Sequence, residues 1–316
     1  MNTSKRVAMA VYHEYPSDPR VRREAEALAG AGFIVDIICL RGEGFEKYES
    51  YGNVNVYRVL KYRHDKKNYV KYMILTSLFT FVSLFKIIRL SLKFKYDLIQ
   101  VHNMPDYLVF FGIFHKLLLR PVILDLHDLS PELFSSRWGK GVKGKILTPI
   151  VRLIERISCS IANHLITTSN GFYDKLVSRG TEKQKITLVF NSANEKIFKL
   201  SAPRKWENLS KDVKIIYHGT IVKRFGLHVA IEAVSKLRDD IPGLKFWLYG
   251  RYDEDYKRDL EEMVKDLKLE NTVSLLYSIP WEGIVKKIEE ADFGVVPYLS
   301  DEFMNLALST KTFEYV

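Results

Sequence analysis

The sequence predicts an α/β protein made of two doubly wound domains, each with a parallel β-sheet covered by helices. Short apolar runs alternate with longer helical patterns along the chain, as strands and crossover helices do in parallel sheets. The length of 316 residues exceeds one ordinary core and fits two domains. A polar stretch, SAPRKWENLSKD at residues 201–212, precedes a strand that restarts the pattern.

We therefore expect a first domain over residues 1–200 and a second over residues 212–316. The first strand, VAMAVY, leads into a helix at residues 18–32, where Asp18 can cap the start, Pro19 suits the first position and Gly32 follows the end. Further strands of the first domain are predicted at 34–40, 54–60, 97–101, 122–126, 164–168 and 186–190. Strands of the second domain are predicted at 213–219, 244–250, 273–277 and 292–298.

Composition narrows the classes of protein. With 47% hydrophobic and 27% charged residues the chain is globular, not disordered. The two cysteines, Cys39 and Cys159, form no disulfide framework and no metal-ligand spacing, which suits the reducing cytoplasm.

The net charge of +10 is uneven, because residues 1–199 carry +13 and residues 200–316 carry −3. One basic cluster lies at residues 58–71 and another at Lys140, Lys143 and Lys145. A nucleic-acid binder could carry such charge, but no RRM, helix-turn-helix or zinc pattern accompanies it, so we expect no nucleic-acid partner. Two alternatives stay open: a solvated basic face, or attraction to an anionic membrane or a phosphorylated acceptor.

Residues 72–85 carry no charge and are followed by Lys86 and Arg89. This run is too short to span a bilayer. It predicts either a helix buried on the first sheet or a monotopic membrane contact flanked by basic residues. The second alternative would place a cytoplasmic protein at the inner face of the plasma membrane.

Polar side chains follow the predicted strands. Ligands of open α/β sheets bind beyond the carboxyl ends of the strands, and four of the eight histidines fall there: His13, His102, His127 and His218. The sequence therefore predicts a functional site at this edge.

Five segments, taken in order, resemble the family-4 glycosyltransferases, which have the GT-B fold and retain anomeric configuration. They are DLIQVHNMPDYL, VILDLHDLSPELF, IERISCSIANHLITTSNGFYDKL, YHGTIVKRFGLHVAIEAV and the final ADFGVVPYLSDEFMNLALSTKTFEYV. The resemblance implies two Rossmann-like domains, the first for the acceptor and the second for the donor. It implies transfer of a sugar from a nucleotide diphosphate to a cell-envelope glycan or a polyprenyl-phosphate-linked acceptor, with no metal or other cofactor.

The resemblance also assigns site residues. His127 would face the transferred sugar, where it could donate to a sugar hydroxyl or stabilise the oxocarbenium-like state through its neighbours, with Asp125 or Asp128 fixing its tautomer. Metal ligation by these three is the alternative, disfavoured because neighbouring strand residues point to opposite faces. Acceptor-side groups would be Glu14, Asp18, Arg20, His102 and Asn103, although helix capping is the simpler role for Asp18.

On the donor side, Glu314 would accept hydrogen bonds from the ribose diol, and Arg224 would meet the diphosphate. The donor-side set implied by the resemblance is Gly219, Thr220, Lys223, Arg224, Lys311 and Glu314. Lys223 could equally be a solvated surface charge.

The chain departs from the family pattern at three places. Thr220 and Phe225 stand where G-R-x-x-x-x-K-G has its Arg and Lys, and Leu306 stands where E-x7-E has its first glutamate. These departures keep open a noncatalytic glycan- or lipid-binding relative. Asp253-Glu254-Asp255 forms a D-x-D, but acidic residues that open a helix explain it better than a metal site.

The chain end predicts an incomplete second domain. The sequence stops at Val316, one turn into a helix after the fourth strand of that domain. We expect it to be a fragment of a longer protein and, as it stands, to have little or no activity.

Overall fold

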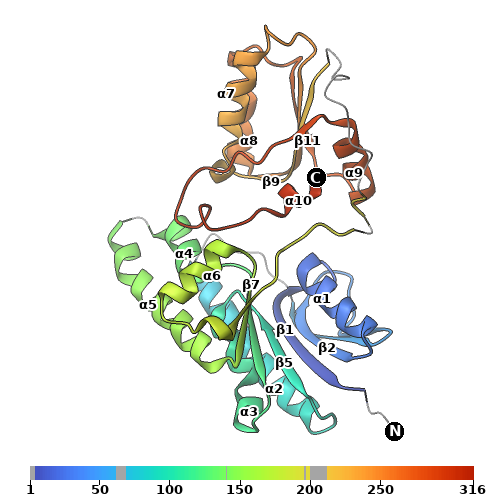
Figure 1. The fold of residues 1–316 in the computed structure, drawn as a ribbon, viewed down its shortest axis with the longest axis vertical. Coiled ribbons are helices and arrows are strands. Elements are labelled where there is room, and N and C mark those ends of the chain that lie inside the picture. Colours follow the sequence, from blue (N-terminus) through green and yellow to red (C-terminus); the bar gives the residue numbers. More distant parts are fainter. Residues whose placement is uncertain (1–3, 62–68, 140, 196, 200–211) are drawn as a thin grey trace. The chain divides into compact units, whose positions relative to one another are not determined.

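The computed structural model describes residues 4–61, 69–139, 141–195, 197–199 and 212–316 (Figure 1). It forms two compact units, one of residues 1–190 with 305–307 and the other of residues 191–304 with 308–316. Each unit has its own sheet. Of the linker predicted at 201–212, only Asp212 lies among the described residues.

The first unit contains an eight-stranded sheet in the order β3-β4-β2-β1-β5-β6-β7-β8. All neighbours pair in parallel except β3, which runs antiparallel to β4 at one edge. The apolar runs correctly predicted the parallel strands, whereas β3 is a short tyrosine-rich edge strand that no apolar run indicates. The strands are β1 (Arg6–Glu14), β2 (Ile34–Arg41), β3 (Tyr48–Tyr51), β4 (Val54–Lys61), β5 (Leu98–His102), β6 (Val122–Leu126), β7 (His164–Thr167) and β8 (Ile186–Leu188).

Helices cover both faces of this sheet. Crossovers between parallel strands are right-handed, so the direction of a connection along the sheet decides which face its helix covers. Helix α1 connects β1 to β2 and lies on one face. The connections β4 to β5, β5 to β6 and β6 to β7 run in the other direction along the sheet and lie on the opposite face. The helices are α1 (Pro19–Gly30), α2 (Tyr69–Ser91), α3 (Ile113–Leu117), α4 (Ser130–Trp138), α5 (Gly141–Ile161) and α6 (Asn170–Ser178), with 3₁₀ segments η1 (Asp106–Gly112) and η2 (Lys183–Lys185).

Helix α1 begins and ends as its sequence predicts. The backbone N–H of Arg20 donates to Asp18 Oδ1 at 3.0 Å, Pro19 occupies the first position, and Gly32 follows the end with φ of +89°. Its buried Val21 and Ala25 pack on the apolar residues of β1 and β2. The helix thereby places Asp18, Arg20 and Glu24 near the carboxyl end of β1.

Helix α2 is longer than the uncharged run that predicted it. It continues through Lys86 and Arg89 to Ser91, and Val70–Ser91 is long and apolar enough to cross a bilayer, with mean hydropathy 1.8. The uncharged run of residues 72–85 is shorter than a membrane span, whereas the helix that contains it is long enough. Length and composition alone are weak evidence for a span, because core helices of globular proteins can meet the same criteria.

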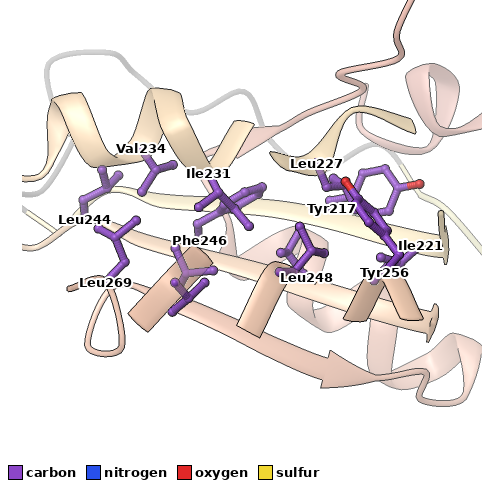
Figure 2. Packing of buried hydrophobic residues seen from close by; sticks show 13 residues of the cluster. Tyr217, Ile221, Leu227, Ile231, Val234, Leu244, Phe246, Leu248, Tyr256 and Leu269 are labelled. Atoms are coloured by element: carbon purple, nitrogen blue, oxygen red, sulfur yellow. The ribbon is translucent and has the colours of Figure 1, made fainter. Parts of the chain in front are cut away.

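The second unit contains a four-stranded parallel sheet in the order β11-β10-β9-β12. Figure 2 shows its core, in which Ile231 of α7 and Tyr256 of α8 pack against Tyr217, Phe246 and Leu248 of the sheet. The elements are β9 (Lys214–Ile221), η4 (Lys223–Phe225), α7 (Leu227–Leu237), β10 (Lys245–Tyr252), α8 (Glu254–Asp266), β11 (Val273–Tyr277), α9 (Trp281–Glu290), β12 (Phe293–Gly294) and α10 (Thr310–Glu314).

Candidate active site

Two histidines of the first unit share one carboxylate. His102 ends β5 and Asp125 lies opposite it in the neighbouring strand β6, so both side chains reach the same edge of the sheet. Asp125 Oδ2 lies 2.6 Å from His127 Nε2 and 3.0 Å from His102 Nδ1. All three side chains are buried. The partner that orients His127 is thus Asp125, one of the two that the sequence suggested.

The protonation states follow from these contacts. Burial alone would raise the pKa of Asp125, but the two imidazoles outweigh burial and lower it, so the group is a carboxylate. Burial lowers the pKa of His127, with the Arg20 cation adding to the effect, so the ring is neutral near pH 7. The pKa of His102 is raised although burial opposes this, because Asp125 and Glu24 stabilise the imidazolium.

The tautomer of His127 is fixed by the same geometry. A neutral ring carries one proton, and Nε2 needs it to donate to Asp125. Its Nδ1 is then an acceptor. His127 can therefore accept a hydrogen bond from a sugar hydroxyl, which corrects the expectation that it donates one.

Glu24 of α1 completes the cluster. Its Oε2 accepts from Gln100 Nε2 at 2.5 Å, and burial, followed by the nearby Asp125 carboxylate, raises the pKa of Glu24 to about 7. A protonated Glu24 can donate to Asp125. Glu24, His102, Asp125 and His127 each present a metal-ligand atom, and these atoms lie within 4.8 Å of one another.

The cluster has the residue types of a zinc site but the spacing of a hydrogen-bonded network. Two ligands at about 2.0–2.1 Å from one tetrahedral zinc lie roughly 3.3 Å apart. His127 Nε2 and Asp125 Oδ2 are 2.6 Å apart, a hydrogen-bond distance. The metal alternative named from the sequence included Asp128, which does not belong to this group.

Asn103 holds the loop that follows β6. Its Oδ1 accepts from the His127 backbone N–H at 2.9 Å, and its Nδ2 donates to Asp106 Oδ1 at 2.8 Å and to the Asp128 carbonyl oxygen at 2.6 Å. Ser130 also donates to Asp106 Oδ1, at 2.7 Å. Asn103 and His102 are both buried, and the side-chain oxygen and nitrogen of Asn103 are hydrogen-bonded within the protein. Asn103 therefore positions the site, and contact of these two residues with an acceptor stays a prediction.

The other acceptor-side candidates lie around this network. Arg20 Nη2 pairs with Asp18 Oδ2 at 3.1 Å, and this contact outweighs burial and lowers the pKa of Asp18. Glu14, at the end of β1, directs its carboxylate toward Gly42, where an added Cβ would lie 2.6 Å from Glu14 Oε2. Asp18 is a helix cap, as the simpler prediction held.

In the second unit, Lys311 crosses over Gly219. Gly219 has φ of +117°, and a Cβ there would lie 2.8 Å from Lys311 Cε. The space left by this glycine is therefore filled by Lys311. Helix α10, capped by Ser309, brings Lys311 back to the carboxyl end of β9.

Aromatic rings surround the Lys311 ammonium. Nζ lies 3.1 Å from the Tyr298 hydroxyl and 5.4–5.7 Å from the ring centres of Tyr217, Phe225 and Tyr298. Phe225 stacks on Tyr298 with ring centres 4.6 Å apart. Phe225, which stands where the family pattern has Lys, thus forms a wall for a different lysine.

Glu314 lies one turn beyond Lys311 and faces His218. Its Oε2 is 3.1 Å from His218 Nε2, and the His218 backbone N–H donates to the Tyr315 hydroxyl at 3.3 Å. Half-exposed Trp281 packs edge-on to the His218 ring at 6.2 Å. A carboxylate, a cation and aromatic rings therefore gather at the carboxyl end of β9.

The remaining donor-side candidates differ in exposure. Lys223 and Thr220 are exposed, whereas Arg224 is half-buried, with its guanidinium 5.2 Å from the Phe225 ring and 5.8 Å from the Phe303 ring. Asp253 caps α8 by accepting from the Tyr256 backbone N–H at 3.2 Å. The D-x-D is therefore a helix start.

Sequence reasoning missed several residues of these sites. Glu24 is visible in the sequence only as one acid of a charged helix. In the sequence, Tyr298, Tyr315 and Trp281 look like ordinary apolar positions, although Tyr298 follows β12, Trp281 opens α9 and Tyr315 ends α10. They are recognisable only when tertiary contacts bring them to His218 and Lys311.

The comparisons with known proteins agree with this architecture. The family model described as Glycosyltransferase Family 4 matches residues 20–196, and that described as Glycosyl transferases group 1 matches residues 199–307. None of the curated proteins compared with the chain matches it in sequence.

Three solved structures share the fold. Sucrose-phosphate synthase from Thermosynechococcus elongatus is 19% identical with a TM-score of 0.71, covering 95% of this chain and 77% of its own. HepE from Anabaena, solved with UDP, is 15% identical with a TM-score of 0.65, covering 98% and 78%. The lipopolysaccharide outer core galactosyltransferase WaaB is 11% identical with a TM-score of 0.62, covering 98% and 78%. Together with the two parallel sheets and the family models, these likenesses confirm that the chain belongs to glycosyltransferase family 4 and has the GT-B fold.

Proposed function

We propose that the protein transfers a sugar from a nucleotide diphosphate to a cell-envelope glycan or a polyprenyl-phosphate-linked acceptor, with retention of anomeric configuration. The observation that carries this proposal is the pairing of Lys311 and Glu314 on one turn of α10 at the carboxyl end of β9. Open α/β sheets bind nucleotides at that edge. One group offers a cation for phosphate and the other a carboxylate for a ribose diol.

The donor contacts divide between these two groups. Lys311 and Arg224 neutralise the diphosphate as the sugar C1–O bond breaks and its electron pair stays on the phosphate oxygen. Glu314, whose Oε2 lies 3.1 Å from His218 Nε2, accepts from the ribose hydroxyls. The relatives support a nucleotide-sugar donor, since HepE is solved with UDP and with UDP-glucose.

His127 acts on the transferred sugar. Its Nδ1 accepts from a sugar hydroxyl, which adds electron density as positive charge develops near C1. The acceptor hydroxyl then bonds to C1, and its proton passes to the diphosphate oxygen that has left C1. Asp125 keeps His127 in the required tautomer, and no metal ion takes part.

The acceptor class and the location form part of the same proposal. WaaB is described as a lipopolysaccharide outer core galactosyltransferase, which supports a cell-envelope acceptor. We place the protein in the cytoplasm, at the inner face of the plasma membrane.

Kinetics of two variants test the division of labour. His127→Ala should lower kcat for a nucleotide sugar far more than it weakens nucleotide affinity, because His127 meets the reacting sugar. Glu314→Gln should mainly weaken nucleotide binding, and Glu282→Gln, an exposed glutamate on α9, serves as its control. Equal effects of both site variants on kcat and on affinity would contradict this assignment.

The second candidate is a noncatalytic glycan- or lipid-binding relative. Thr220 and Phe225 favour it, because they replace the two cations of the family pattern. Nucleotide binding without release of nucleotide from any sugar donor would support this candidate over the enzyme.

A further inference from the structure

Helix α2 exposes a stripe of large apolar side chains, although Phe79, Ile87 and Leu90 on its other face are buried. Its exposed face carries Val70, Ile74, Leu78, Phe81 and Phe85, with Phe81 61% exposed. Its buried face includes three hydroxyl residues, Thr76, Thr80 and Ser83. The Thr76 and Thr80 hydroxyls donate to helix carbonyl groups at 2.8 and 2.9 Å. A continuous exposed apolar stripe on a helix that buries hydroxyl residues fits a helix whose outer face contacts lipid.

Helix α5 repeats the arrangement. Its exposed apolar residues recur every three or four positions, which places them on one stripe: Val142, Ile146, Ile150, Leu153 and Ile157. Helix α8 provides the contrast within the same protein, because its exposed positions are charged.

These helices belong to one layer. Both α2 and α5 pack on η1, and the crossover directions place them with α3 on the same face of the sheet. Phe110 and Phe114 are exposed between them, and Leu117–Leu119 follow at the end of α3, with Leu119 93% exposed. Half of the exposed large apolar side chains in the described residues lie on this α2–α3–α5 layer.

The charge around the layer is positive. Arg89, Lys93, Lys145, Arg152 and Arg156 are exposed on or beside the helices. The two acidic residues that the described parts of these elements contain, Asp106 and Glu155, are both buried. Of the basic cluster predicted at 58–71, Arg58 is instead buried, donating to the Tyr15 carbonyl oxygen at 3.0 Å, and residues 62–68 lie outside the described part.

A basic hollow adjoins the stripe of α5. It has a volume of about 590 Å³ and is lined by Arg152, Arg156, Lys175, Arg179 and Lys185, along with Glu155 and Glu182. Arg179 Nη1 donates to both carboxylate oxygens of Glu155, at 2.6 and 2.9 Å. Glu155 therefore pairs with Arg179 and does not neutralise Arg152 and Arg156. The hollow can take the phosphate of a lipid headgroup.

We propose that the α2–α3–α5 layer docks on the surface of an anionic phospholipid bilayer. The apolar side chains enter the interface between headgroups and acyl chains, and the basic residues of α5 and its hollow hold the lipid phosphates. Helix α2 lies in the plane of the membrane, because its other face packs along β1, β2 and β4. A second copy of the chain fits this layer poorly, since it would bring the same positive charge.

Cosedimentation with vesicles tests the proposal without any nucleotide sugar, so its outcome is independent of the proposed reaction. The protein should bind phosphatidylcholine vesicles that contain phosphatidylglycerol, and binding should fall as sodium chloride is raised. The paired substitutions Phe81→Ser with Phe85→Ser, and Ile146→Ser with Leu153→Ser, should each weaken binding about tenfold or more. The control pair Val229→Ser with Leu237→Ser alters similarly exposed residues of α7 and should bind normally.

The charge is tested separately. Arg152→Gln with Arg156→Gln should weaken binding about 25-fold, since each basic residue near an anionic surface contributes about fivefold. Lys236→Gln with Lys265→Gln makes the same charge change on α7 and α8 and should have little effect. All these positions are exposed, so the melting temperatures should stay close to that of the unmodified protein. Equal binding by face variants and controls would overturn the proposal, as would a concentration-dependent dimer that the face variants abolish.

Discussion

The Lys311 side chain passes directly over Gly219. A Cβ at position 219 would lie only 2.8 Å from Lys311 Cε, so this close contact requires a glycine. Two segments almost a hundred residues apart thus meet without a gap. The lysine ammonium is held at the end of β9 by the Tyr298 hydroxyl and by three aromatic rings. Gly219 therefore sets the position of the cation that we assign to the diphosphate.

Gly219→Ala should displace Lys311 and weaken nucleotide binding about tenfold or more, because the charge moves away from the phosphates. Its φ of +117° adds backbone strain of about 1–3 kcal/mol, which lowers stability as well. Gly32→Ala is the matched control: its φ is +89° and nothing lies within 4 Å of an added Cβ. Calorimetric titration with nucleotide should show weakened binding in Gly219→Ala alone. If the control loses as much affinity, strain and not Lys311 explains the effect.

The sequence predicted best what depends on local order along the chain. Asp125, His127 and His218 were singled out because they lie at or near the carboxyl ends of buried parallel strands, which meet at one edge of a sheet. Glu24 was missed because its role depends on a contact with Gln100 of β5, far along the chain. In the same way, the sequence shows only that Phe225 replaces the lysine of the family pattern. The structure shows that the Lys311 ammonium lies beside the Phe225 ring.

Two fold details were missed for similar reasons. The run 292–298 reads as a full strand, but only Phe293 and Gly294 pair with β9, and Pro297 has no N–H to continue the ladder. In α2 the sequence revealed an uncharged run but not its orientation. Which side faces outward depends on packing against β1, β2 and β4.

Asp125→Asn should lower kcat about 100-fold or more, because the amide cannot fix the His127 tautomer and stabilise His102 at once. Breaking a buried charge pair should also lower the free energy of unfolding by about 3–5 kcal/mol. Asp36→Asn is the control, since Asp36 is equally buried in the same sheet and pairs with Arg6 at 2.9 Å. The control should lose stability but keep its kcat per folded molecule. Normal kcat in Asp125→Asn would remove Asp125 from the mechanism.

Turnover should survive EDTA, because Lys311 and Arg224 are assigned to the diphosphate in place of a cation. The test matters because Glu24, His102, Asp125 and His127 are residue types that bind zinc in other proteins, and their ligand atoms lie close together. Elemental analysis of the purified protein should find far less than one zinc per chain. Loss of activity in EDTA with rescue by manganese, or one zinc per chain, would replace the hydrogen-bonded network with a metal site.

Glu24→Gln should change how stability depends on pH. The pKa of Glu24 is raised to about 7 in the folded protein, against 4.5 for an ordinary glutamate. Between these values the folded state keeps a proton that the unfolded chain has lost, so the free energy of unfolding falls as pH rises. The stabilisation that the protonated group provides is complete below pH 4.5 and is lost as pH passes 7.

The glutamine side chain of this variant would stay neutral and could still donate to Asp125, so the variant should match the unmodified protein at about pH 4.5 and be more stable above about pH 7. Asp125 has the opposite trend, because its lowered pKa favours folding as pH rises, but it is present in both proteins and its direct contribution cancels in the difference. Glu26 lies on the exposed side of the same helix, and Glu26→Gln should show no such gain in stability with rising pH. Melting temperatures measured from about pH 4.5 to about pH 8.5 decide the matter. A constant difference in melting temperature across that range would mean that Glu24 is ionised in the folded state. In that case Glu24 does not donate a hydrogen bond to Asp125.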